Sequence, residues 1–350
     1  MRLIRPSYEI IEQGPGLQGI YDIIERCGKT SYKSEVKGGE DAKRFVEART
    51  KEKHGAVLEF GTVYLKIPAP RKPYYDNEEW RIKATIEFYE GNKYSKVAID
   101  PVGRYNPYYI TTNYRVLVEN NRLDDLKYLC EPTEYHEKRY AVKFITDIGV
   151  GREFLRHRVM SMVQESTRYV NYSKEKFGNE CTFVIPPWIG KHELAEGEHI
   201  VRWDGDWVDI DKMRIVKVSG DYDKNDRVDT WLSGLKFCED TYMALLSDWS
   251  HIEDIKEEHK KPWMAQQARG VLPLATKTEF VLCGYEDAWV HFFRLRSDIS
   301  ATGKPHPQAQ ELANPLRDEF ISRGYLTEKD LEHDLFGSFD VGISDVDLRL

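Results

Sequence analysis

The chain has no long apolar run among its 350 residues. Its first residues, MRLIRPSYEIIEQ, lack the apolar core of a signal peptide, and no later stretch approaches the ~18 consecutive apolar residues that a membrane span needs. From these absences we expect neither a membrane span nor secretion through such a signal. We therefore expect a cytoplasmic protein that has no membrane partner.

The chain also has little cysteine. Its five cysteines lie far apart, with no CxxC pair and no histidines at the spacing of metal ligands. Such a distribution predicts neither a disulfide framework nor a metal site. We expect buried, reduced thiols that take no part in the chemistry. The cysteines are Cys27, Cys130, Cys181, Cys238 and Cys283.

The chain has fewer basic than acidic residues, so its formal net charge is −8. A general nucleic-acid binder needs a net basic face that displaces counterions from phosphates, so this class is excluded. The signatures of zinc hydrolases, serine hydrolases and dinucleotide-binding Rossmann domains (HExxH, GxSxG and GxGxxG) are absent too. Any anion must therefore be bound by a local group of cations.

What the sequence does contain is the composition of a folded protein, with 41% hydrophobic and 31% charged residues. TVYLKI (62–67) predicts a strand, and EDAKRFVEARTKEKHG (40–55) predicts an exposed helix that ends at its glycine. TWLSGLKFCEDTYMALLSDW (230–249) predicts a long helix with one apolar face. YAVKFITDIGVG (140–151) runs into a segment whose apolar residues, from Phe154 to Met162, recur at helical spacing.

Two stretches have the character of insertions. Residues between the predicted strand and position 140 carry helix signals of their own, EEWRIKATIEFYE (78–90) and NYRVLVENNRLDDLKYL (113–129). We place this insertion at about residues 70–138 and a second at about 189–228. In the second, Asp204-Gly205 separates two alternating arms, which is typical of a tight β-hairpin. We expect one domain, 1–350, interrupted by these insertions.

The most informative segment is RHRVMSMVQESTRY (156–169), preceded by Arg152. Arginine presents a planar fork of donors that matches a phosphate or the edge of a nucleobase. The alternative interpretation is a solvated basic helix end. The apolar neighbours of the cluster and the small polar residues Ser166 and Thr167 favour the binding of a nucleotide-sized anion.

Two later segments each contribute an arginine. Arg269 follows a predicted helix, where a cation is favourable even without a ligand. In GYEDAWVHFFRLRSD (284–298), Arg296 shares a helical stripe with Tyr285 and apolar residues. A buried arginine there needs either a structural carboxylate such as Asp298 or a bound anion. His291, next to that stripe, is either a core histidine or a ligand contact.

Several motifs occur in a fixed order along the chain. RHR at 156–158 is followed, after seven residues, by Ser166 and then by RY at 168–169. RGVLPLATKTEF, HFFRLRSD and HPQAQELA come later, and TSYKS and HGAVLEF come earlier with weaker similarity. This set resembles the flavin-dependent thymidylate synthase family. The resemblance covers most of 140–190 and 262–315 and leaves out the two insertions.

The resemblance implies an α+β fold, a twisted sheet flanked by helices, in one catalytic domain. It implies a homotetramer whose active sites lie at subunit interfaces. FAD is the implied cofactor, NADPH the reductant and methylenetetrahydrofolate the one-carbon donor in the reductive methylation of dUMP to dTMP. No covalent protein nucleophile takes part, which agrees with the cysteines, because none has the Pro-Cys-His context of the cysteine-dependent enzymes.

The resemblance also implies roles for single residues. Arg296 is the implied catalytic residue, which stabilises the uracil ring as its anion and raises electron density at C5. The residues implied for dUMP are Glu153, Arg156, Gln164, Glu165, Ser166, Thr167, Arg168 and Arg269. The residues implied for FAD are Ala56, Arg156, His157, Arg158, Gln164, Tyr285, Asp287, His291 and His306.

The chain departs from the family at some of these positions. Tyr285 and Asp287 stand where an asparagine and an arginine are common, and Val163-Gln164 where Asn-Glu is frequent. Ala56 replaces a more usual polar residue. The dUMP arginines match the family, so the departures concentrate among the FAD contacts.

Two other functions are compatible with these residues. One is a related flavin enzyme that modifies another pyrimidine nucleotide or leaves the one-carbon unit as hydroxymethyl. The other is a nucleotide-binding protein that keeps the arginine pocket but has lost catalysis, with the insertions as partner surfaces. Product analysis on dUMP and dCMP separates the first from thymidylate synthesis, and the retained Arg296 and Ser166 weigh against the second.

Overall fold

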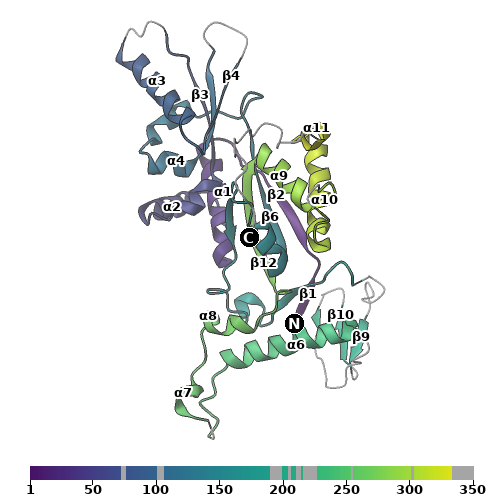
Figure 1. The fold of residues 1–350 in the computed structure, drawn as a ribbon. Helices are drawn as coiled ribbons and strands as arrows, with labels where there is room; N and C mark the ends of the chain where they lie inside the picture. Colours follow the sequence, from purple (N-terminus) through teal and green to yellow (C-terminus); the bar gives the residue numbers. More distant parts are fainter. Residues whose placement is uncertain are drawn as a thin grey trace, which may run out of the picture. The chain divides into compact units, whose positions relative to one another are not determined.

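The computed structural model describes residues 1–71, 76–100, 106–189, 199–203, 206–209, 214–215, 227–253, 255–300 and 303–332. These residues form an α+β fold with three open sheets and flanking helices, which confirms the expected fold class (Figure 1). The chain divides into two compact units, Met1–Ala288 and Trp289–Leu350, with the boundary inside helix α9 (Glu286–Arg296). The expected single domain with two insertions stays a prediction.

The sheet that carries most of the predicted site has the strand order β2-β6-β12-β7, with every pair antiparallel. Its strands are β2 (Ser7–Ile11), β6 (Arg139–Asp147), β7 (Ser161–Gln164) and β12 (Lys277–Tyr285). β12 pairs with β6 along its whole length, from Lys277 opposite Asp147 to Tyr285 opposite Arg139. The β-branched and aromatic content of both strands explains this long pairing.

The two faces of this sheet pack against different helices. On one face, Phe144 and Phe280 stack at 5.3 Å between ring centroids and contact Phe154 of α5 (Ile148–Phe154). On the other face, Val281 and its neighbours pack under α1 (Gly16–Gly28). Side chains alternate between faces along a strand, so Lys277 and Glu279 also point to the α1 face.

α1 runs into the short helix η1 (Lys29–Tyr32), and Lys33 then adopts a left-handed φ of 47°. α2 (Gly39–Lys51) contacts α1, and η2 (Gly55–Phe60) follows. The expected helix is therefore confirmed, but it ends at Lys51 and not at Gly55. The reason is local: Lys53 takes a left-handed φ of 56°, which breaks the helical path.

A three-stranded sheet, β3-β5-β4, belongs largely to the first expected insertion. β3 (Thr62–Ile67) is the predicted strand and ends before Pro68. β5 (Tyr108–Asn113) pairs with β3, and β4 (Lys96–Ile99) pairs with the other edge of β5. Asp76 caps α3 (Asn77–Glu90) by accepting a hydrogen bond from the backbone of Glu79. α4 (Tyr114–Glu119) and η3 (Leu123–Tyr128) complete this region and confirm the helix signals read there.

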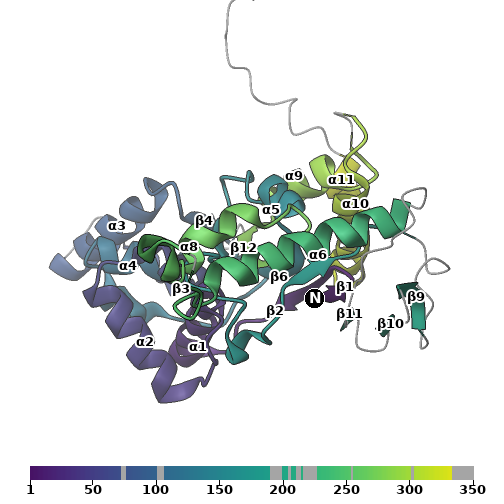
Figure 2. The same ribbon diagram turned by 90° about the horizontal axis from the view of Figure 1, so that it is seen from below.

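The third sheet has the order β8-β1-β11-β10-β9. Its strands are β1 (Arg2–Ile4), β8 (Thr182–Val184), β9 (His199–Trp203), β10 (Asp206–Asp209) and β11 (Arg214–Ile215). β9 and β10 pair antiparallel as the expected hairpin requires, and its turn residues, Asp204 and Gly205, lie outside the described residues. The predicted long helix is α6 (Arg227–Leu246) (Figure 2). Its Leu232 and Tyr242 share a hydrophobic core cluster with Leu3 of β1 and Phe183 of β8.

Short helices complete the first unit. They are η4 (Glu175–Phe177), α7 (Glu257–Lys260), α8 (Ala265–Ala268) and η5 (Arg269–Val271). The second unit contains most of α9, α10 (Pro307–Ser322) and α11 (Glu328–Glu332), and Trp289, Phe293 and Phe320 pack together in its core. No helix in the described part of the chain is long and apolar enough to cross a bilayer.

One sequence expectation about the sheet region is wrong. The helical spacing from Phe154 to Met162 predicted a continuous helix, but α5 ends at Phe154 and Met162 lies in β7. Val159 is 75% exposed. The cause is tertiary, because pairing of Met162 with Leu282 of β12 draws this segment into the sheet.

Candidate active site

The RHR motif lies in the turns between α5 and β7. The carboxylate of Asp147 caps α5 by accepting a hydrogen bond from the Val150 N–H at 2.8 Å, and α5 is held against the sheet by Phe154. After it, His157 is buried, whereas Arg156 and Arg158 are exposed. Neither guanidinium has a carboxylate partner among the residues that the structure describes. Their charge is available to a ligand.

The segment after β7 is tied to the sequence TSYK near the N-terminus. The Glu165 N–H donates to the Glu279 carbonyl at 2.7 Å, and the Ser166 N–H donates to the Ser31 carbonyl at 3.1 Å. The Ser166 carbonyl then accepts from the backbone N–H groups of Tyr169 and Val170 and so closes a turn. We call residues 166–168 the serine–arginine loop.

Arg269 meets this loop from a distant part of the sequence. Its guanidinium donates to the hydroxyl of Thr167 at 3.2 Å, from η5 just after α8. The expected helix end at Arg269 is confirmed, since α8 stops at Ala268. Arg168 and Arg269 are both exposed, and within the described ranges neither pairs with a carboxylate. The loop therefore gathers two uncompensated arginines, a serine and a threonine.

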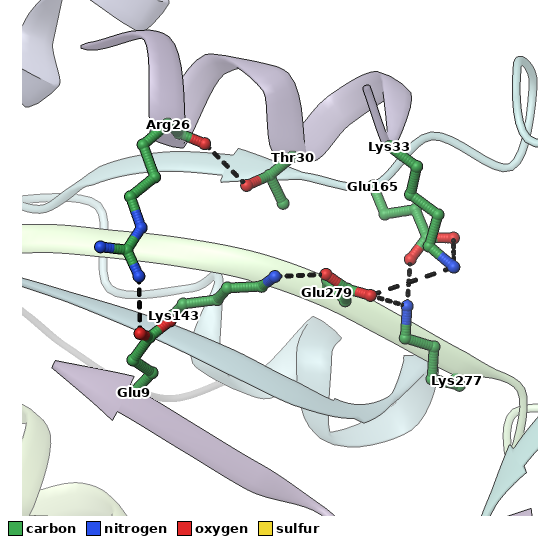
Figure 3. Close-up of polar contacts among 8 residues, drawn as sticks. All are labelled: Glu9, Arg26, Thr30, Lys33, Lys143, Glu165, Lys277 and Glu279. Atoms are coloured by element: carbon green, nitrogen blue, oxygen red, sulfur yellow. Dashed lines mark hydrogen bonds and ion pairs between the residues drawn. The ribbon is translucent and has the colours of Figure 1, made fainter. Parts of the chain in front are cut away.

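A group of buried charges adjoins the loop (Figure 3). The Lys277 ammonium lies 2.8 Å from Glu165 and also pairs with Glu279. Lys33 lies 3.5 Å from Glu165, and Lys143 lies 2.6 Å from Glu279. These five side chains form what we call the lysine–glutamate network: Lys33 follows η1, Lys143 lies in β6, Glu165 follows β7, and Lys277 and Glu279 lie in β12. The Lys277 and Glu165 side chains are 6% and 1% exposed, so this pair is withdrawn from water.

The network shifts the acidity of its members. Burial opposes ionisation of Glu279, but the ammonium groups of Lys277 and Lys143 outweigh it and lower the pKa of Glu279 to about 2. Burial lowers the pKa of Lys33, and the neighbouring Lys277 ammonium adds to this effect despite the attraction of Glu165. For Lys277 the two carboxylates prevail over burial and raise its pKa. Charged Lys277 is therefore the stable form at the centre of the network.

The sequence interpretation missed four of these five residues and proposed only Glu165. A usable signal was present, because Lys277 and Glu279 interrupt an otherwise apolar strand at alternate positions. Alternation places both on one face, and Lys143 on the paired strand lies on the same face. Lys33 gave no comparable signal, since its pairing depends on the turn after η1.

Tyr285 and Asp287 have their polar atoms engaged by the chain. The Tyr285 hydroxyl lies 2.9 Å from the Thr111 carbonyl and 3.1 Å from the Tyr94 carbonyl. The Asp287 carboxylate lies 3.2 Å from the Lys96 ammonium. These contacts anchor the β4–β5 region onto the end of β12. The Gln164 amide is also engaged, donating to Thr278 at 3.0 Å, while Ala56 is exposed in η2.

Arg296, His291 and His306 lie in the second unit. Arg296 is the last residue of α9 and is half-buried, as is His291, and His306 precedes α10 as an exposed residue. The predicted apolar stripe needs correction in two respects. Tyr285 ends β12 and does not begin the helix, and Arg296 is only partly buried because it lies at the helix end. The Asp298 carboxylate accepts a hydrogen bond from Arg317.

The cysteines agree with the sequence interpretation in being free thiols. Cys27, Cys181 and Cys283 are buried, and Cys130 and Cys238 are partly buried. Burial raises the pKa of all five thiols. Because the thiolate is the reactive form, such groups are weak nucleophiles at neutral pH. Within the described residues no cluster of histidine, cysteine and carboxylate side chains has the arrangement of a metal site.

The family model for thymidylate synthase complementing proteins matches residues 131–322, more than half of the chain. The chain belongs to this family. The match confirms the resemblance drawn from the RHR and serine motifs. It spans the serine–arginine loop, Arg269 and Arg296, and begins after most of the first expected insertion.

Two solved structures of a UMP/dUMP methylase, PolB from Streptomyces cacaoi, are similar to the chain. The one bound with 5-Br dUMP has a TM-score of 0.39 at 14% identity and covers 95% of this chain and 96% of its own. The one bound with 5-Br UMP has a TM-score of 0.38 at 13% identity and covers 95% of each chain. No curated protein matches the sequence.

Proposed function

We propose that this chain is a FAD-dependent thymidylate synthase that methylates dUMP to dTMP, with methylenetetrahydrofolate as carbon donor and NADPH as reductant. The observation that carries the proposal is the meeting of Arg269 with the serine–arginine loop through Thr167. Arginines from two distant segments, without carboxylate partners in the described part of the chain, favour a dianionic phosphate ligand. Family membership supports the reaction type.

The assignment of dUMP follows from the chemistry of the loop. Arg168 and Arg269 offer charged forks for the phosphate, and the Ser166 and Thr167 hydroxyls offer neutral donors beside them. Arg156 extends this set from the RHR turns, and Glu153 and Gln164 complete the assigned base and sugar side. Glu165 differs from the others. Its carboxylate pairs with Lys277 and Lys33, so we assign it the role of supporting the loop beside dUMP.

Some of the residues assigned to FAD are suited to bind it and others are less so. Arg156 and Arg158 are exposed and have no carboxylate partner within the described ranges, which suits the anionic part of the cofactor. We therefore assign FAD to the RHR turns together with His157, Ala56, His291 and His306. Tyr285 and Asp287 fit less well, because the hydroxyl of one and the carboxylate of the other are bound to the β4–β5 region. The bound flavin would supply the hydride that completes the methyl group.

The residues of the chain would carry out the polar part of the reaction. None of the five cysteines has a lowered pKa, so attack by a protein thiolate on the uracil ring is not part of the proposal. We assign activation of the ring to Arg296, which would stabilise negative charge at N3 and O4. We also propose the homotetramer with active sites at subunit interfaces, which would supply the remaining walls of the site.

The experiment is a spectrum followed by product analysis. Purified protein mixed with FAD should show bound oxidised flavin, and dUMP should accelerate or permit oxidation of NADPH. Chromatography of reactions supplied with dUMP, UMP or dCMP then identifies the methylated or hydroxymethylated product. dTMP from dUMP alone supports the proposal. A protein that takes up no flavin contradicts it, and product from another nucleotide reassigns the substrate.

A further inference from the structure

The lysine–glutamate network lies at one end of the α1 face of the sheet. Under α1 this face is apolar, with Ala141, Val281 and Cys283 packed against Ile23. Where α1 gives way to η1, the same face carries charges (Figure 3). Since both regions are covered by the chain, burial alone does not explain why one is charged. The charged end is the one that adjoins the serine–arginine loop.

Glu165 is the member of the network that touches the loop directly. One carboxylate oxygen lies 3.5 Å from the Lys33 ammonium and accepts from the Tyr172 hydroxyl at 3.4 Å, and the other lies 2.8 Å from Lys277. Its N–H is bonded to Glu279, and the next N–H, of Ser166, is bonded to Ser31. The side chain and the backbone are therefore both held where the loop begins.

Folding stability alone does not require ions at this place. Removing ions from water is costly, and apolar residues of similar volume often serve equally well in a buried site. The adjacent apolar part of the same face shows that the fold accommodates such residues here. What an ion network supplies and an apolar cluster does not is a defined orientation of each polar group.

Lys33 adds a second cost at the same place. Its φ of 47° lies in the left-handed region, which is unfavourable for a residue with a Cβ such as lysine. Burial also disfavours its charged form. This strained turn places the Lys33 ammonium on Glu165 while the neighbouring Ser31 carbonyl holds Ser166. The two contacts make one clamp between the turn after η1 and the start of the loop.

We propose that Lys33 and Lys277 are positioning residues that act through Glu165 to hold the serine–arginine loop in the conformation that binds the anionic nucleotide. This inference rests on the proposed function, because it takes the loop as part of the nucleotide site. The network carries three ammonium groups and two carboxylates, so it also leaves one positive charge beside the loop. If the network acts by orienting the loop, replacing the third lysine, Lys143, should have little effect on nucleotide binding. If it acts by attracting the anion through net charge, replacing Lys143 should matter as much as replacing the other two.

Three lysine-to-methionine variants of the full-length, FAD-loaded protein make the test. Lys33→Met and Lys277→Met each remove a cation from Glu165. Lys143→Met is the matched control: its side chain is 27% exposed against 28% for Lys33, and it also removes one charge, but among the described residues Lys143 pairs with Glu279 alone. For each variant we would measure the Kd for dUMP by calorimetry, KM and kcat for dTMP formation, and the thermal midpoint.

If Lys33 and Lys277 position the loop, their variants should bind dUMP more weakly than the Lys143→Met control does. Lys33→Met and Lys277→Met should raise Kd and KM for dUMP about tenfold or more, equivalent to roughly 1.4 kcal/mol, with kcat at saturation near the wild-type value. Lys143→Met should stay within about twofold, because it loses only a partly exposed ion pair. An equal rise in all three variants would mean attraction by net charge and would overturn the inference.

A double variant covers the case in which Lys277→Met does not fold. Glu165→Gln/Lys277→Met leaves no unpaired carboxylate at this pair, so it should recover the thermal midpoint while dUMP affinity stays low. Wild-type affinity in the stable double variant overturns the positioning role. Failure of the proposed function looks different, since the wild-type protein itself would then neither bind nor convert dUMP.

Discussion

The arginines and the lysines of the candidate site are used in opposite ways. Arg156, Arg158, Arg168 and Arg269 are exposed, and among the described residues none pairs with a carboxylate. Lys33, Lys143 and Lys277, by contrast, all pair with Glu165 or Glu279. The planar guanidinium matches the oxygens of a ligand phosphate, whereas each of these ammonium groups already lies against a carboxylate of the fold. This difference distinguishes the arginines, whose charges can bind a ligand, from the lysines, whose charges bind carboxylates of the protein itself.

Among the arginines, we expect the largest effect on the reaction rate from a substitution of Arg296. Arg296→Lys keeps the charge but loses the fork that addresses N3 and O4 together, and losing one preorganised donor costs ~10² to 10³ in rate. Single-turnover dTMP formation by the reduced, FAD-loaded variant at saturating dUMP and folate measures this loss. A folded variant that turns over at the wild-type rate removes Arg296 from the mechanism. A structural arginine would instead lose thermal stability and FAD content in step with activity.

For the lysine–glutamate network we expect the free energy of unfolding to fall at acid pH. The pKa of Glu279 is about 2 in the folded protein against an ordinary 4.5, so its ionised form stabilises the fold above pH 4.5. That stabilisation, roughly 3 kcal/mol, is lost as pH falls from 4.5 towards 2. Urea unfolding between neutral and acid pH should show this loss, and Glu279→Gln should flatten it. The same acid slope in both proteins would show that the network does not depend on Glu279.

Arg269 offers a smaller effect that sharpens the contrast. Arg269→Gln removes a charged donor from the serine–arginine loop and should raise the Kd for dUMP by roughly ten- to a hundredfold. Its thermal midpoint should barely change, because the residue is exposed. Arg44→Gln is the control, since Arg44 is 70% exposed and pairs with Asp41 on α2. Equal dUMP affinity in the two variants would mean that Arg269 is not a ligand residue.

Much of the fold was accessible from local patterns. The strand 62–67 and the helices near 78–90 and 230–246 followed from periodicity, proline and turn signals. Periodicity failed between Phe154 and Met162, where pairing with β12 decides the outcome. It also placed Tyr285 on a helix although it ends a strand. Both failures occur at junctions, where local spacing is compatible with either element.

The sequence by itself determined the family, the RHR and serine motifs and the free state of the cysteines, because these depend on residue identity and spacing along the chain. Only the tertiary structure decided which charges are compensated. Lys33 and Lys277 reach Glu165 through a turn and a strand register, and Arg269 reaches Thr167 through the end of α8. Coulomb interactions depend on the distance between two charges and on how deeply they are buried, and neither can be read from the number of residues that separate them along the chain.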